Sequence, residues 1–173
     1  MIIYPSPPPP VIPPEMLGFT RLSCAADIRA LKDNLREDDL RDIQYIAGHD
    51  PETALLEGFL RSRHCVTFFR PGDPTDVIGM GGLVFPSIVW LLFHKGYFTR
   101  QSDRAFFLSV CPIVRDWLLD QAAGGFMHNM TLKRNRRLRR WLRWLGAVEL
   151  PMEGDVVPFY FQKQRQQEVR PHV

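Results

Sequence analysis

The residues of this chain that could do chemistry on their own are its cysteines and two of its histidines. Cys24, Cys65 and Cys111 are far apart and odd in number, without the CxxC or Cys/His spacing of a zinc site or the even set of a disulfide framework. His94 and His128 have no acid or nucleophile spaced to form a catalytic pair, and no GxSxG, HExxH or P-loop pattern occurs. We therefore expect polar histidines, no metal site and thiols in a reducing compartment, although an odd cysteine can also pair with another chain.

The stretch RNRRLRRWLRWLG, residues 134–146, is dense in arginine and contains no acid. On a helix its apolar residues form one stripe at positions i, i+3, i+4 and i+7 that we expect to face the core: Leu138, Trp141, Leu142 and Leu145. The opposite face carries the arginines that follow Lys133 and Arg134, namely Arg136, Arg137, Arg139, Arg140 and Arg143. Three interpretations of this face stay open: a solvated surface, a contact with an acidic protein such as a neighbouring subunit, and a contact with nucleic-acid phosphates. Trp144 lies off the stripe, either as an exposed interface anchor or packed against the last strands.

Hydrophobic periodicity and turn signals predict the elements of the first half of the chain. TRLS is expected to be a first strand, followed by helical spacing in residues 25–35 and 36–48 with Gly48 as a helix stop. Asp50 is expected to cap a further helix that has Pro51 at its first position. Strands are expected at 65–70, 76–85 and 87–93, the third being apolar and central in the sheet. The glycines of the second strand indicate a bulge or a close backbone approach.

The second half of the chain continues with helices and strands in alternation. Residues 99–122 predict a long helix that contains Pro112, and a glycine turn and a strand follow up to residue 132. The basic helix comes next, and residues 146–164 predict two strands around a turn at Glu153–Gly154. The order β, two or three helices, β, β, β, α, β, α, β, β fits the α/β (α+β) class, with helices packed on the faces of a mixed sheet.

Length and composition fit one sizeable domain. The chain has 173 residues, of which 45% are hydrophobic and 24% charged, as in ordinary globular proteins. The formal net charge is only +3, so the basic helix is a local concentration of charge. The N-terminus lacks the features of a signal peptide, and the longest apolar run, IVWLLF, is far shorter than a membrane span. We expect a soluble protein without membrane contact.

The N-terminal segment is rich in proline. Residues 5–14 hold seven prolines, among them Pro7, Pro8, Pro9 and Pro10. Because proline fixes φ and lacks an N–H, this arm is expected to be extended polyproline II that cannot join a helix. It is either a semi-rigid linker or an arm that lies in a groove of a neighbouring chain. We divide the chain into this arm (1–17), a folded domain (18–163) and a polar tail (164–173).

The order of elements resembles the GNAT acyltransferase fold, a mixed, mostly antiparallel sheet flanked by helices. Asn135 stands eleven residues before Gly146, and the stretch LRRWLRWLGAVE runs past this glycine. The distance between the two residues is similar to that from the start of the family's penultimate helix to the following strand. The domain is similar to GNAT-like morphogenesis and internal virion proteins of short-tailed bacteriophages in three segments: LREDDLRDIQYIAGHDPETAL, VWLLF and NRRLRRWLRWLGAVE. The resemblance implies a protein of the internal core, portal or tail region of a virion, present in the host cytoplasm during assembly. It would contact other virion proteins, in many copies around a ring, and touch packaged DNA weakly.

The resemblance also implies where acetyl-CoA would bind. In GNAT proteins the loop after the fourth strand is a glycine-rich turn whose backbone N–H groups bind the pyrophosphate. The matching segment is HKGYFTRQSDRA, which has one glycine, and Tyr97 and Phe98 stand where small residues are expected. The residues of this degenerate loop are Lys95, Gly96, Tyr97 and Arg100, and weak anion binding by its cations, with Arg104, is a minor alternative.

The family's general-acid tyrosine corresponds to Leu142, which cannot protonate a leaving thiolate. Together with the altered loop, this departure predicts a non-catalytic structural protein that needs no cofactor. Two alternatives remain. One is an active acetyl-CoA-dependent N-acetyltransferase, and the other is a nucleic-acid-binding accessory protein whose affinity falls steeply with salt.

Overall fold

The helices and strands follow one another in the order that the sequence predicts. The computed structural model describes residues 11–151 and 154–163. Its elements are β1 (Thr20–Leu22), α1 (Ala25–Leu31), α2 (Glu37–Asp42), α3 (Pro51–Arg61), β2 (Ser62–Arg70), β3 (Asp73–Val84), β4 (Ile88–Phe93), α4 (Gln101–Gln121), β5 (Phe126–Leu132), α5 (Arg136–Trp144), β6 (Val148–Glu149) and β7 (Val156–Gln162). A π-helical turn, Ile43–Ala47, continues α2, and a short 3-10 helix, Tyr97–Thr99, connects β4 to α4.

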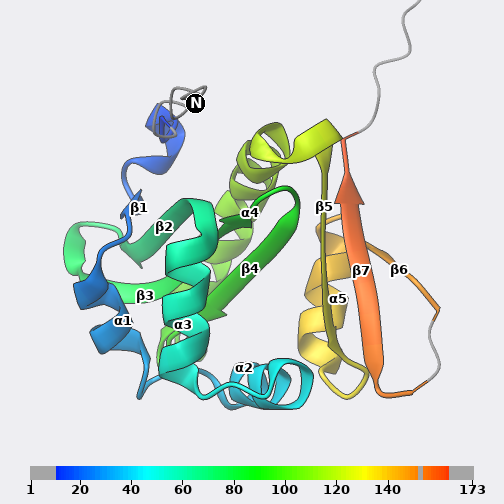
Figure 1. The fold of residues 1–173 in the computed structure, drawn as a ribbon. Helices are drawn as coiled ribbons and strands as arrows, with labels where there is room; N and C mark the ends of the chain where they lie inside the picture. The colour runs from blue at the N-terminus through cyan, green and yellow to red at the C-terminus, as the bar shows by residue number, and fades with distance from the viewer. Residues whose placement is uncertain (1–10, 152–153, 164–173) are drawn as a thin grey trace, which may run out of the picture.

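Seven strands form one sheet in the order β1-β2-β3-β4-β5-β7-β6. Every neighbouring pair is antiparallel except β4 and β5, which run parallel. This mixed, mostly antiparallel sheet with flanking helices confirms the predicted fold class (Figure 1). The apolar strand β4 lies in the middle of the sheet, as predicted, and the short strands β1 and β6 form its edges.

The sheet divides at the junction of β4 and β5. Only Ile88 and His128 pair across this junction, whereas β5 and β7 pair along their whole length. The two strands therefore diverge beyond Ile88, with β1–β4 on one side and β5, β7 and β6 on the other (Figure 1). Strands that separate in this way leave part of their backbone without a partner in the sheet.

Helices cover both faces of the sheet (Figure 1). On one face α1 and α3 pack around Leu31, Leu55 and Met80, all fully buried. On the other face α4 and α5 contribute Leu118 and Leu142 to a larger core. The sheet is thus the middle layer, and a site between its two halves is bordered by both helical layers.

Strand β3 approaches its neighbours too closely for ordinary side chains. A Cβ atom on Gly81 would lie 2.7 Å from the Trp90 carbonyl oxygen, and one on Gly82 would lie 2.3 Å from the His64 carbonyl oxygen. The register of β3 against β2 also skips Ile78, as in a β-bulge. The predicted close approach and bulge are both confirmed.

Side chains cap two helices, and the cap of α3 is the one that the sequence predicts. Asp50 accepts a hydrogen bond from the Thr53 N–H at 3.0 Å, and the first residue of α3 is the predicted proline. Asn135 caps α5 by accepting the Leu138 N–H at 3.3 Å. Gly48 ends the helical segment that starts with α2, and its φ of 68° is the left-handed conformation that favours glycine.

The longest helix, α4, has 21 residues and contains Pro112 as predicted. Because proline has no N–H, the carbonyl of Leu108 loses the donor that it would find four residues ahead. Within the described residues, no helix combines the length and the apolar composition needed to span a bilayer.

The described part of the proline-rich arm starts at residue 11 and includes a short helix. Pro14–Met16 form a 3-10 helix, and the Met16 side chain is fully buried in the larger core. The expectation that the prolines cannot join a helix is therefore wrong at Pro14, because a proline at a first helical position loses no hydrogen bond. The predicted arm residues Pro7, Pro8, Pro9 and Pro10 and the tail 164–173 lie outside the described residues. Their contacts stay predictions.

Candidate functional site

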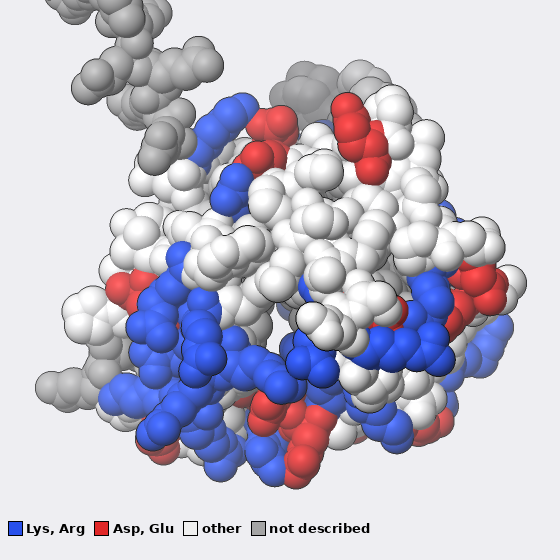
Figure 2. Space-filling model, turned by 180° about the vertical axis from the view of Figure 1, so that it is seen from behind, with Lys and Arg blue, Asp and Glu red and all other residues white. Residues whose placement is uncertain are grey.

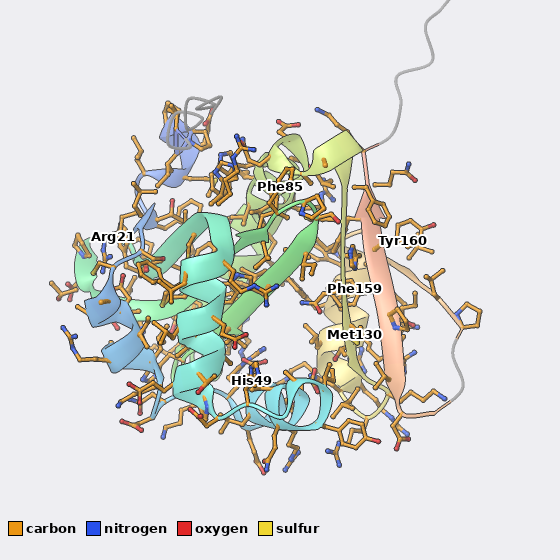
Figure 3. All side chains as sticks on the ribbon, viewed as in Figure 1. Arg21, His49, Phe85, Met130, Phe159 and Tyr160 are labelled. Carbon is orange, nitrogen blue, oxygen red and sulfur yellow. The ribbon has the colours of Figure 1, made fainter. Side chains whose placement is uncertain are left out.

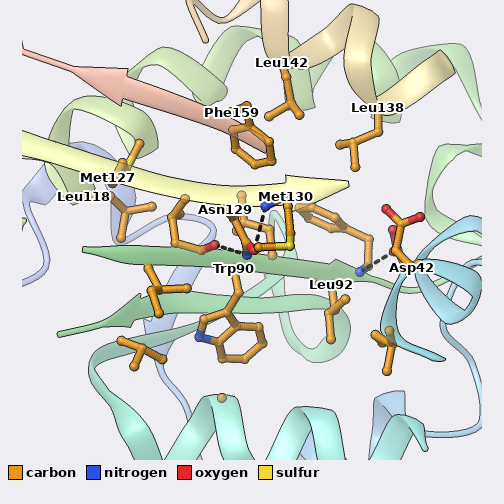
Figure 4. A pocket seen from close by; sticks show the side chains of 18 of the residues that line it. Asp42, Trp90, Leu92, Leu118, Met127, Asn129, Met130, Leu138, Leu142 and Phe159 are labelled. Atoms are coloured by element: carbon orange, nitrogen blue, oxygen red, sulfur yellow. Dashed lines mark hydrogen bonds between the residues drawn. The ribbon is translucent and has the colours of Figure 1, made fainter. Parts of the chain in front are cut away.

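A cavity lies where β4 and β5 diverge. Its volume is about 410 Å³, and residues of both halves of the sheet and of both helical layers line it. Trp90 points from β4 towards α3, whereas Leu138 and Leu142 point from α5 towards the strands (Figure 4). His49, in the loop before α3, and Met130 of β5 border the cavity on the α3 side (Figure 3). The cavity therefore extends through the sheet between its two helical layers.

The register of β3 and β4 determines which backbone groups of β4 face this cavity. The N–H of His94 donates to the carbonyl of Ile78 at 2.8 Å. In an antiparallel ladder only every second residue of a strand forms hydrogen bonds with a given neighbour, so every second residue of β4, counted back from His94, turns its backbone groups to β3. The backbone groups of the intervening residues of β4, Val89, Leu91 and Phe93, consequently point away from β3, towards β5.

Of these three residues of β4, Leu91 keeps both of its outward backbone groups unpaired. Asn129 Nδ2 donates to the Val89 carbonyl at 2.6 Å, and its Oδ1 accepts the Met130 N–H at 2.8 Å (Figure 4). The Phe93 carbonyl accepts the backbone N–H of Arg36 at 3.1 Å. No such hydrogen bond involves the Leu91 backbone within residues 11–151 and 154–163, so one N–H and one carbonyl are presented to the cavity.

Asp42, at the end of α2, brings a carboxyl to the cavity wall. Its Oδ2 accepts hydrogen bonds from Thr131 Oγ1 at 2.5 Å and from Asn135 Nδ2 at 3.2 Å. Its Oδ1 is buried without a partner among the described residues. Burial raises the pKa of Asp42, although the bonds from Thr131 and Asn135 act in the opposite direction. This carboxyl can therefore accept a proton or a hydrogen bond from a molecule in the cavity.

Two more carboxylates line the α2–α3 side of the cavity. Asp39 is buried and is held by the Arg36 guanidinium at 2.7 and 2.9 Å. Glu57 of α3 lies 3.9 Å from His49 Nε2 and 3.8 Å from a guanidinium nitrogen of Arg61. The side of the cavity next to α4 and α5 is instead lined mostly by apolar side chains. The two ends of the cavity thus differ in polarity.

The connection from β4 to α4 contains the residues assigned to the cofactor loop: Lys95, Gly96, Tyr97 and Arg100. Lys95 and Arg100 are exposed, and the Gly96 N–H donates to His94 Nδ1 at 3.0 Å. Tyr97 is only 2% exposed, and the Arg70 guanidinium lies 5.5 Å from the centre of its ring. Burial raises the pKa of Tyr97 to about 12. The tyrosine is part of the core, and the loop is not an open glycine turn.

Aromatic rings fill the space beside this connection. Phe98 lies 5.5 Å from Phe93 and 4.9 Å from Phe107, measured between ring centres. Phe107 of α4 in turn stacks on Trp141 of α5 at 5.6 Å. The rings join β4, the 3-10 helix, α4 and α5 in one cluster. The bulky residues that the sequence has in place of glycines are therefore needed for packing.

The first turn of α4 carries an acid. Asp103 is 9% exposed and accepts a hydrogen bond from Arg70 Nη1 at 2.6 Å, while Arg70 Nε binds Asp76 at the same distance. Asp103 lies in the first turn of α4, where the helix dipole favours negative charge, and it adds a negative charge beside any anion that would bind there. Tyr97 and Phe98 fill the adjacent turn, so this connection differs from the open glycine turn that the resemblance implies.

No ionisable side chain stands at the position that the resemblance assigns to a general acid. Leu142 is 3% exposed and lines the cavity. The nearby cavity residue Cys111 is buried, and burial raises its pKa to about 12. At neutral pH this thiol is protonated and is not an activated nucleophile.

The two histidines singled out in the sequence differ in their contacts. His94 Nδ1 accepts the Gly96 N–H, which confirms a satisfied polar position. His128 lies on β5 with its ring 5.7 Å from that of Phe126. In the part of the chain that the structure describes, no group of histidine, cysteine or acidic residues is arranged to hold a metal ion.

The basic helix α5 turns its apolar stripe to the core, as predicted, with Leu142 and Leu145 buried and Leu138 and Trp141 packed against them. Four of its arginines are exposed on the other side: Arg136, Arg137, Arg140 and Arg143. Arg139 differs, because Glu149 binds its guanidinium at 2.9 and 2.8 Å. Trp144 is 55% exposed, so of the two positions expected for its side chain the structure shows the exposed one. Lys and Arg side chains gather over α5 on this face of the molecule (Figure 2).

Sequence reasoning missed Leu91 and Asp42. Leu91 lies in an apolar strand, and only the parting of β4 from β5 leaves its backbone unpaired. Asp42 looks like one of several acids on a solvated helix, and its burial depends on Thr131 and Asn135, far along the chain. The one local signal for Asp42 was Asn135. Its side-chain oxygen caps α5, which leaves its side-chain amide N–H to donate to another residue.

Solved structures show which proteins share this fold. An acetyltransferase from Agrobacterium tumefaciens str. C58 superposes with a TM-score of 0.59 at 15% identity, over 94% of this chain and 99% of that one. The ribosomal-protein-S18-alanine N-acetyltransferase from Escherichia coli gives 0.56 at 10% identity, over 87% and 97%. Spermidine N-acetyltransferase from Vibrio cholerae, in complex with CoA and spermine, gives 0.51 at 12% identity, over 83% and 94%. The sequence matches no protein-family model and no curated protein.

These likenesses extend over most of each chain, at identities too low to carry function. The neighbours include acetyltransferases described as members of the GNAT family, among them one from Bacillus cereus ATCC 10987 with a TM-score of 0.52. Together with the topology of the sheet and the parting of β4 from β5, they show that this chain has the GNAT acyltransferase fold.

Proposed function

We propose that this chain is a non-catalytic protein with the acyltransferase fold and that it acts through contacts with other proteins. One observation carries the proposal: the connection that would bind the pyrophosphate of acetyl-CoA is packed with Tyr97 and Phe98 in place of glycines and carries the acid Asp103. The residue at the position of the family's general acid, Leu142, supports the proposal independently, because a buried leucine cannot donate a proton. No cofactor is part of this proposal.

The particle to which such a protein would belong is a finer proposal. It rests on the similarity of three sequence segments to GNAT-like virion and morphogenesis proteins of short-tailed bacteriophages. On this proposal the chain is made in the host cytoplasm and contacts other virion proteins in the core, portal or tail region. Many copies around a ring are part of this finer proposal.

A thiol-release assay tests the absence of catalysis. The purified chain is mixed with acetyl-CoA, alone and with a panel of amines, and free CoA is followed with a thiol reagent. We expect no release above the uncatalysed rate. Amine-dependent release that scales with protein concentration contradicts the proposal.

A second candidate, acetyl-CoA-dependent N-acetyltransferase activity, is favoured by the cavity itself. Asp42 Oδ1 is buried without a partner in its wall among the described residues, where it can accept a hydrogen bond from an amine. In such an enzyme Asp42 would hold the proton that the amine loses. The named activities of the solved neighbours belong to the same class.

The same assay separates the two candidates if it includes Asp42→Asn. Under the second candidate this change abolishes thiol release, whereas Asp38→Asn, a substitution elsewhere on α2, leaves it intact. Equal release by both variants excludes the role of Asp42.

A further inference from the structure

Among the described residues, α5 and the two residues before it carry the densest group of cations without a carboxylate partner. Outside α5, eight cations have a carboxylate within 4.0 Å, whereas Arg29, Arg63, Lys95, Arg100 and Arg104 have none among the described residues; the paired ones are Arg21, Lys32, Arg36, Arg41, Arg61, Arg70, Arg115 and Lys163. Among the described residues, none of the four exposed arginines of α5 has such a partner: Arg136, Arg137, Arg140 and Arg143. Lys133 and Arg134, just before the helix, are exposed as well. We call the four helical arginines the α5 arginine face.

The helix that carries this face is held firmly. Its apolar stripe is packed in the core, and its cap residue Asn135 is 5% exposed and bound both to Leu138 N–H and to Asp42. Arg136, Arg140 and Arg143 follow one another at i, i+4 and i+7, on one side of the helix. At about 1.5 Å per residue they span about 10 Å. The backbone therefore presents its charges in a fixed row.

Along the chain, no acid lies between Asp120 and Glu149 to balance this row. The nearest acid along the chain, Glu149, binds Arg139, and the attraction of Arg139 and Arg143 lowers its pKa. Four like charges at these spacings repel one another and weaken the helix slightly. A partner with a regular row of negative charges would remove this repulsion.

We propose that the α5 arginine face binds the phosphate backbone of a nucleic acid, without reading its sequence. A row of about 10 Å matches about three phosphates of one strand, which follow at about 3.4 Å along the duplex axis. Arginine suits such contacts because its planar guanidinium fits two phosphate oxygens. Trp144, 55% exposed at the end of the helix, adds a ring on which an unpaired base can stack.

An acidic protein fits this surface less well. Protein interfaces have an apolar centre from which charged residues are depleted. On α5, Trp144 alone among the large apolar residues is exposed, and the rest of the outward surface is arginine. The inference goes beyond the proposed function and does not depend on it, because these arginines lie outside the cavity lining.

Fluorescence anisotropy tests the proposal with the full chain and labelled single-stranded and duplex oligonucleotides of unrelated sequence. We expect binding to all of them, with the logarithm of the association constant falling against the logarithm of salt with a slope of about −3 to −4. The double variant Arg136→Gln/Arg140→Gln should reduce that slope by about 2 and weaken binding equally on every sequence. Circular dichroism checks that the variant still folds.

Two controls make the outcome decisive. Arg29→Gln/Arg63→Gln removes the same number of exposed charges elsewhere, on α1 and β2, and should leave the slope unchanged. The proposal is overturned by an absence of binding at low salt, or by equal losses in the two double variants. It is also overturned if poly-glutamate displaces the oligonucleotide at equal charge concentration, which would identify a surface for acidic proteins.

Discussion

At the scale of single residues, the close approach of strands around β3 leaves almost no freedom for substitution. Gly79, Gly81 and Gly82 each face atoms within 3.0 Å of where a Cβ would stand. For Gly82 the nearest atom is the His64 carbonyl oxygen at 2.3 Å, so a methyl group could be accommodated only by a shift of the backbone. These glycines keep β3 and β4 in the register that turns the Leu91 backbone towards the cavity.

Gly82→Ala should therefore destabilise the fold by about 1–3 kcal/mol or more, because it overpacks a backbone contact. Gly18→Ala is the matched control, since nothing lies within 4 Å of a Cβ there. Urea unfolding followed by circular dichroism measures both. Equal stability of the two variants would show that β2 can move away from β3 at little cost.

A buried carboxylate links stability to pH. Asp27 is 2% exposed, and burial alone would raise its pKa. Arg21 at 2.7 and 2.8 Å, Thr67 at 2.7 Å and the Cys24 N–H at 2.9 Å outweigh burial and hold the pKa below its ordinary 3.8. The stability that these bonds contribute is present above pH 3.8 and is lost as the pH falls through the lower pKa of the folded state.

Asp27→Asn should lower stability at neutral pH and flatten its dependence on pH below 3.8. Denaturation midpoints collected between neutral and strongly acidic pH provide the measurement, with Asp33→Asn at an exposed aspartate of the neighbouring turn as the control. An Asp27→Asn curve that runs parallel to the parent's would contradict the role of this carboxylate.

At the scale of elements, α5 connects the candidate site to the surface. Asn135 caps the helix through Leu138 N–H and at the same time donates to Asp42 Oδ2. One residue therefore fixes both the start of the basic helix and the carboxyl of the cavity wall. Asp50, which caps α3 through the N–H and hydroxyl of Thr53, has only the first of these tasks.

Asn135→Ala should cost more than Asp50→Ala, for which about 1 kcal/mol is expected from the loss of a cap. The additional loss arises because Asp42, partly buried, gives up one of its two side-chain donors. Thermal unfolding of the two variants gives the comparison. Equal losses would mean that the bond between Asn135 and Asp42 contributes nothing to stability.

The elements were predictable because their signals are local. The periodicity of α5, the cap of α3 and the glycines of β3 can each be recognised within about a dozen residues of sequence. The ion pair of Arg139 with Glu149 and the bonds of Asp42 depend on which elements lie side by side, and a single sequence does not contain that information. The helical turn at Pro14 was missed for a different reason, since its proline was read as part of a uniform extended arm.

At the scale of the whole molecule, the chain has the acyltransferase fold, and bulky side chains occupy the segment where that family has a glycine-rich turn. The parting of β4 and β5 leaves a cavity through the sheet, with carboxylates at one end and apolar side chains at the other. The turn that should hold the cofactor's pyrophosphate is packed with Tyr97 and Phe98 and carries Asp103. A second surface, the α5 arginine face, lies outside the cavity. The shared fold therefore does not by itself carry the cofactor chemistry to this chain.

Calorimetric titration of the full chain with acetyl-CoA, at low and then at moderate salt, tests this account most directly. The account predicts no heat of binding at millimolar ligand, because no turn is open to the pyrophosphate. Micromolar binding that persists at moderate salt would contradict it and would establish acetyl-CoA as a ligand of the cavity.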